Sequence, residues 1–99
     1  MLIVRGVNVF PSAVRDVVSG FAPRVSGHVR LRPTADGVKQ EPPLPVAVEL
    51  ARGAEPDARL SEEIRERLRA VLVVSTQVEL VPWGSFERSE YKSKLVERQ

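Results

Sequence analysis

The sequence predicts an α+β fold in which two helices cover one face of a small β-sheet. Residues 25–32 and 45–50 alternate apolar and polar side chains with the period of two that half-buried strands show. Residues 12–19 and about 56–72 instead place apolar side chains three or four positions apart, as amphipathic helices do. The 99 residues suffice for one domain with a modest core.

The chain opens with an apolar strand that leads into a helix through a sharp turn. The run from Leu2 to Val4 is interrupted by Gly6, resumes with two alternating valines and ends where Pro11 begins a helical pattern. Because Gly6 has no Cβ, it permits a positive φ or the close approach of another molecule. Asn8 is a poor strand former that offers both a donor and an acceptor. Pro11 suits the first turn of a helix.

The remaining elements follow in a simple order. The helix over 12–19 buries a stripe that includes Phe10, Val14 and Val18, and its valines imply that burial rather than propensity stabilises it. The strands 25–32 and 45–50 are expected to pair antiparallel across a proline-rich loop, 33–45. The helix at 56–72 buries four large apolar side chains, worth roughly 6–12 kcal/mol gross, and its charged back is expected to be a solvated face.

A last strand, 76–81, ends at Pro82-Trp83-Gly84-Ser85, and residues 86–99 form a polar tail that is expected to be mobile. The order strand, helix, strand, strand, helix, strand is that of a ferredoxin-like βαββαβ sandwich.

Composition excludes several classes of function. There is no cysteine, and the single histidine, His28, falls on the polar face of its strand, so neither a disulfide framework nor a cysteine or histidine metal site is expected. The net charge of +2 is dispersed, which argues against a nucleic-acid partner. No apolar run approaches the roughly 20 residues of a membrane span. We expect a soluble, cytoplasmic protein, and the absence of residues ahead of the first strand predicts a piece of a longer chain.

No phosphate loop, zinc motif or catalytic triad is present, so the residues alone predict a small binding or accessory domain. Two places stand out, which are the turn at Arg5-Gly6 and the polar segment 88–94.

Both places resemble a known family. The opening Met-Leu-Ile-Val-Arg-Gly-Val-Asn-Val-Phe-Pro-Ser resembles the start of the C-terminal domain of phenylacetate-coenzyme A ligases, which are adenylate-forming enzymes. Residues 84–92 resemble that family's Gly-Ser-x-Pro-Arg-Ser-Glu-Gly-Lys, which maps the family's lysine onto Lys92. The family's proline stands here as Glu87, and its glycine before the lysine stands as Tyr91. Lys94 is the alternative if Tyr91 alters the loop.

The resemblance implies that residues 1–99 are a lid that swings on a large N-terminal domain, which binds ATP with Mg and an aromatic carboxylic acid. In one pose Lys92 is implied as the catalytic residue that neutralises negative charge while acyl-AMP forms. In the other pose the opening turn faces the pantetheine arm of coenzyme A. The residues implied on that side are Arg5, Gly6, Val7 and Asn8. The resemblance implies that the fragment alone is inactive. It is also compatible with a dimer of the protein.

The alternative is a ferredoxin-like regulatory module that dimerises and binds a small molecule at its helix-strand edges. A module that recognises RNA would need aromatic residues on its central strands, and residues 3–9 and 46–50 offer none.

Overall fold

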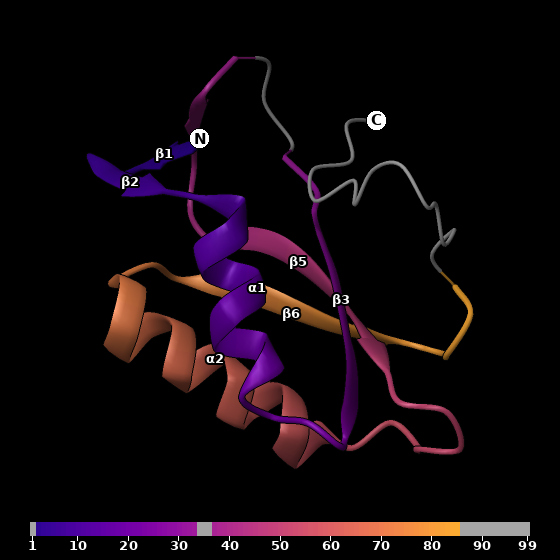
Figure 1. The fold of residues 1–99 in the computed structure, drawn as a ribbon. Coiled ribbons are helices and arrows are strands. Elements are labelled where there is room, and N and C mark those ends of the chain that lie inside the picture. The colour runs from indigo at the N-terminus through magenta and orange to yellow at the C-terminus, as the bar shows by residue number, and fades with distance from the viewer. Residues whose placement is uncertain (1, 34–36, 86–99) are drawn as a thin grey trace.

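The computed structural model describes residues 2–33 and 37–85 (Figure 1). In chain order the elements are β1 (Leu2–Val4), β2 (Val7–Val9), α1 (Pro11–Ser19), β3 (Val25–Leu31), β4 (Lys39–Gln40), β5 (Leu44–Leu50), α2 (Ala58–Leu72) and β6 (Thr76–Val81). The predicted α+β class is confirmed. In the described ranges, no helix has the length and apolarity that crossing a membrane would require. The predicted mobile tail lies outside the described residues.

The main sheet has the strand order β3-β5-β6. The β3 and β5 strands pair antiparallel, as the sequence predicts, and β5 and β6 pair parallel with Leu44 opposite Thr76 and Val48 opposite Leu80. A parallel pair needs a crossover connection, and α2 provides it. In Figure 1 both helices lie on the same side of this sheet.

The core lies between that sheet face and the two helices. Val14 and Val18 of α1 and Ile64 and Leu68 of α2 are fully buried, together with the inward residues of β5. Phe10 was expected to share the buried stripe of α1 but is 53% exposed. The reason is that Phe10 is the N-cap of α1 and has an extended backbone, so its side chain does not follow the helical face.

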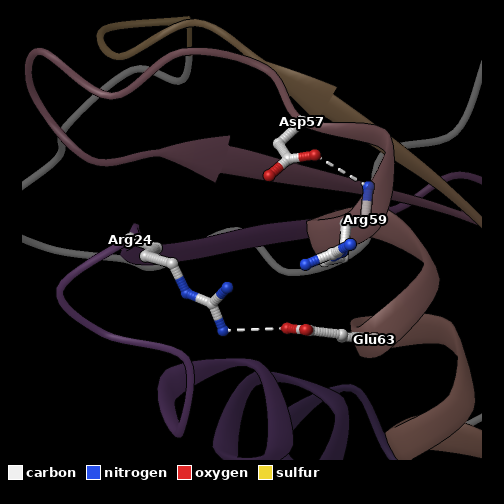
Figure 2. Close-up of polar contacts among 4 residues, drawn as sticks. All are labelled: Arg24, Asp57, Arg59 and Glu63. Carbon is white, nitrogen blue, oxygen red and sulfur yellow. Dashed lines mark hydrogen bonds and ion pairs between the residues drawn. The ribbon is translucent and has the colours of Figure 1, made fainter.

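Figure 2 shows polar contacts at the start of α2 and between α2 and the turn that follows α1. The carboxylate of Asp57 accepts a hydrogen bond from the Arg59 backbone N–H at 2.9 Å, which satisfies one of the free donors at the helix start. At the other end, Val73 adopts a left-handed conformation and its N–H donates to the Arg69 carbonyl. Arg24, in the turn after α1, forms an ion pair with Glu63 at 2.9 Å.

The opening segment differs from the single strand that the sequence predicts. The β1 and β2 strands form an antiparallel hairpin, with Val4 opposite Val7 and the two residues between them as the turn. Arg5 and Gly6 have φ of +48° and +78°, and positive φ at both central residues is the type I′ geometry that suits the twist of a tight hairpin. The β1 strand also pairs parallel with β4, so β2-β1-β4 is a second sheet. Hence the predicted loop 33–45 contains a short strand.

Candidate functional site

The four residues predicted on the coenzyme A side lie together at the tip of the β1-β2 hairpin. Arg5, Gly6 and Asn8 are exposed, and Val7 is half-buried. The tip is firmly placed, because Leu2, Val4 and Val9 behind it are at most 3% exposed and belong to the core. The site is therefore an exposed loop on a rigid base.

The space in front of Gly6 is open. A Cβ at this position would meet no heavy atom within 4 Å, while its φ of +78° lies in the region that side chains rarely adopt. Glycine is thus required by the turn and leaves a bare stretch of backbone facing outward.

Arg5 occupies the left-handed region without being a glycine, which costs roughly 1–2 kcal/mol. Among residues 2–33 and 37–85, no carboxylate forms an ion pair with its guanidinium. Arg5 therefore presents an exposed cation on a strained backbone at a fixed tip, which makes it a candidate ligand-binding residue.

The second candidate region begins where β6 ends. The Ser85 backbone N–H donates to the Pro82 carbonyl at 3.1 Å, and Gly84 between them has a φ of +88°, so residues 82–85 form a tight turn. The guanidinium of Arg52 lies 5.5 Å from the centroid of the Trp83 ring, which is a cation-π contact. This turn is the point from which the C-terminal segment departs.

Glu49 is a residue of this region that the sequence analysis missed. Its side chain is fully buried on the sheet face opposite the helices, and its carboxylate accepts a hydrogen bond from the Gly84 backbone N–H at 3.2 Å. Burying a carboxylate is costly unless it is hydrogen-bonded. The only signal in the sequence was an acidic residue late in a central, strongly apolar strand.

Lys92 and Lys94, with Glu87 and Tyr91, lie outside the described residues, so the structure locates only the root of their segment. The hairpin and the end of β6 lie on opposite sides of the domain (Figure 1). The structure thus brings Arg5 to Asn8 together and keeps them apart from the root of the lysine segment.

The described part of the chain contains no group of three or more His, Cys, Asp or Glu residues that could hold a metal ion. His28 is half-buried on β3, and its backbone N–H donates to the Ser26 hydroxyl at 3.2 Å.

Comparison with known proteins identifies the family to which this chain belongs. A family model described as the AMP-binding enzyme C-terminal domain matches residues 6–98. The chain is 35% identical over 98 residues to the phenylacetate-coenzyme A ligase of Escherichia coli (strain K12), and the match spans 94% of this chain but 22% of that protein.

Solved structures agree with the fold. A domain of phenylacetate-coenzyme A ligase from Bacteroides vulgatus ATCC 8482 superposes with a TM-score of 0.75 at 27% identity, covering 100% of this chain and 93% of that one. A 2-hydroxyisobutyryl-CoA ligase in the postadenylation state, bound to R3-HIB-AMP, gives a TM-score of 0.83 at 27% identity, over 100% of this chain and 21% of that one.

The same ligase in an open conformation, with 2-HIB-AMP and CoA, gives a TM-score of 0.75 at 27% identity, over 94% of this chain and 20% of that one. The chain spans about a fifth of the length of these complete ligases. It belongs to the family of AMP-binding enzyme C-terminal domains, and its relatives are the corresponding domains of CoA ligases.

Proposed function

We propose that residues 1–99 are the lid domain of a phenylacetate-CoA ligase-like enzyme. That enzyme would activate an aryl or related carboxylic acid with ATP to acyl-AMP and then transfer the acyl group to coenzyme A. The proposal is supported by the match to CoA ligases along nearly the whole chain. The observation that carries it is the hairpin tip, where Arg5, Gly6 and Asn8 are exposed and the space in front of Gly6 is open.

The hairpin tip fits the arm of coenzyme A. The open backbone at Gly6 lets a thin, flexible chain lie against the turn without meeting a Cβ. Asn8 offers a side-chain donor and acceptor, which suits the amide groups of pantetheine. Arg5 adds a permanent cation that suits the anionic groups of the same molecule. Val7, half-buried beneath them, holds the turn on the core.

The remaining substrates and the metal ion are assigned to the rest of the enzyme. The described residues do not fit Mg²⁺, because they contain no cluster of suitable ligands. We therefore assign Mg²⁺ to the large N-terminal domain, and we propose that the same domain binds the carboxylic acid and makes most contacts to ATP. Lys92 is proposed as the cation that the lid domain, residues 1–99, contributes while the adenylate forms. One ammonium in a dry cleft strongly stabilises developing negative charge.

The experiment that tests the coenzyme A side is Gly6→Ala in the full-length ligase that contains this domain. Thioester formation from supplied acyl-AMP should slow about tenfold, because the new Cβ and the strained φ displace the turn from the pantetheine arm. Adenylation, measured by pyrophosphate exchange, should not change.

Gly53→Ala is the matched control, because Gly53 also has a positive φ, +83°, and open space at its Cβ but lies away from the tip. Equal loss of thioester formation in both variants would show that strain alone is responsible and would refute the assignment.

A further inference from the structure

Within the part of the chain that the structure describes, the outer strand of the main sheet has a free edge. The β6 strand pairs with β5 on one side only, and the Leu44 N–H donates to the Ser75 carbonyl at 2.9 Å. In a parallel pair of strands, every second residue directs its N–H and C=O groups toward the neighbouring strand. The bond to Ser75 shows that Ser75 and every second residue after it along β6 are the ones that face β5. The residues between them, Thr76, Val78 and Leu80, therefore direct their N–H and C=O groups outward. The strand contains no lysine or proline, which commonly protect an edge from pairing, and its one charged residue is Glu79.

A groove runs beside this edge. It has a volume of about 510 Å³ and lies between α2 and β6, with walls that include Glu62, Arg65, Glu66 and Arg69 on the helix and Thr76 and Val78 on the strand. Thr76 is 3% exposed, and its buried hydroxyl oxygen forms no hydrogen bond within the described ranges.

The charges on the helical wall are self-complementary. Along α2 they alternate in sign, and the order is antisymmetric about the midpoint between Arg65 and Glu66. A two-fold axis at that point would bring Glu62 of one copy to Arg69 of the other and Arg65 to Glu66. Glu62 already pairs with Arg65 within the helix, while among residues 2–33 and 37–85 no ion pair involves Glu66 or Arg69.

We propose that the edge of β6 and the adjacent side of α2 are a homodimer interface. Two copies pair β6 with β6 antiparallel, so their two three-stranded sheets become one continuous sheet, and the two α2 helices lie beside each other above the joint. We infer a second copy rather than a charged peptide as the occupant. The groove carries positive and negative side chains, and a two-fold rotation brings each one to a side chain of opposite charge. This inference is independent of the proposed ligase function.

The 99-residue chain is suitable for the test, since the Bacteroides vulgatus domain that it matches over 93% was solved as a separate chain. Sedimentation equilibrium from micromolar to near-millimolar concentration should show a reversible dimer. Arg69→Glu should weaken it at least about tenfold, because the substitution places like charges opposite each other twice. Adding Glu62→Arg to that variant should restore most of the affinity.

Arg67→Glu is the matched control, because Arg67 lies on the same helix but lines the groove toward α1. It should leave the dimer unchanged. Amide exchange at Val78 should also slow as concentration rises, since its N–H becomes paired. A chain that stays monomeric throughout, or a dimer that Arg67→Glu weakens and Arg69→Glu does not, would overturn the proposal.

Discussion

At the scale of single residues, Glu49 connects the sheet to the segment that follows it. A fully buried carboxylate is unfavourable, yet it lies on the central strand and accepts the N–H of Gly84, thirty-five positions later in the chain. Its position makes the turn 82–85 part of the folded domain rather than a loose end. Any role of the lysine segment then depends on where this turn is held.

Glu49→Ala should therefore destabilise the domain by about 2–4 kcal/mol, because it removes the acceptor of the Gly84 N–H and leaves a void at a fully buried position. Urea denaturation followed by circular dichroism measures the change. The control is Glu79→Ala, whose carboxylate is 64% exposed and pairs with Arg32 at the surface. It should cost less than about 1 kcal/mol. Similar losses for both variants would contradict the anchoring role of Glu49.

The sequence could not reveal Glu49 as buried. Period-two alternation places it on the polar side of β5, where water would normally solvate it. Its burial is set by tertiary contacts, and the one with Gly84 is remote in sequence. By contrast, Gly6 and Asn8 could be identified because each residue type is unusual within an apolar strand, a purely local signal.

At the scale of elements, the start of α2 depends on one side chain. Asp57 caps the helix at the Arg59 N–H, and no acidic residue in the first turn assists it (Figure 2). Asp57→Ala should lower the free energy of unfolding by about 1 kcal/mol. Asp16→Ala serves as the control, since Asp16 is exposed in the interior of α1 and should change stability by less than about 0.5 kcal/mol. Equal shifts in the urea midpoint would show that Asp57 does not act as a cap.

The sequence predicted both helices and the strands β3, β5 and β6 to within a few residues, because each carries a strong period that one buried face imposes. It missed the hairpin, because it took residues 2–9 as one apolar strand interrupted by Gly6, although Val4 and Val7 are three positions apart and so break the period of two. It also missed β4, which has two residues and pairs only because the hairpin presents β1 to it. Short strands of this kind are set by tertiary pairing rather than by their own pattern.

At the scale of the whole molecule, the two candidate regions are separated. The hairpin tip and the end of β6 lie on opposite sides of the domain (Figure 1). Under the proposed function, one active site of the larger enzyme would meet the hairpin tip and the lysine segment in different poses. Rotation of the domain between two poses would present them in turn. The two half-reactions should then be separable by mutation.

In the full-length ligase, Lys92→Ala should reduce adenylation, measured by pyrophosphate exchange, by about a hundredfold or more, because a cation that neutralises the forming adenylate is lost. Thioester formation from supplied acyl-AMP should stay within about twofold, since Lys92 would then face away from the active site. Lys94→Ala is the control and should leave both half-reactions unchanged. Loss of adenylation in Lys94→Ala alone would transfer the role to Lys94, and equal loss of both half-reactions in Lys92→Ala would refute the alternation of poses.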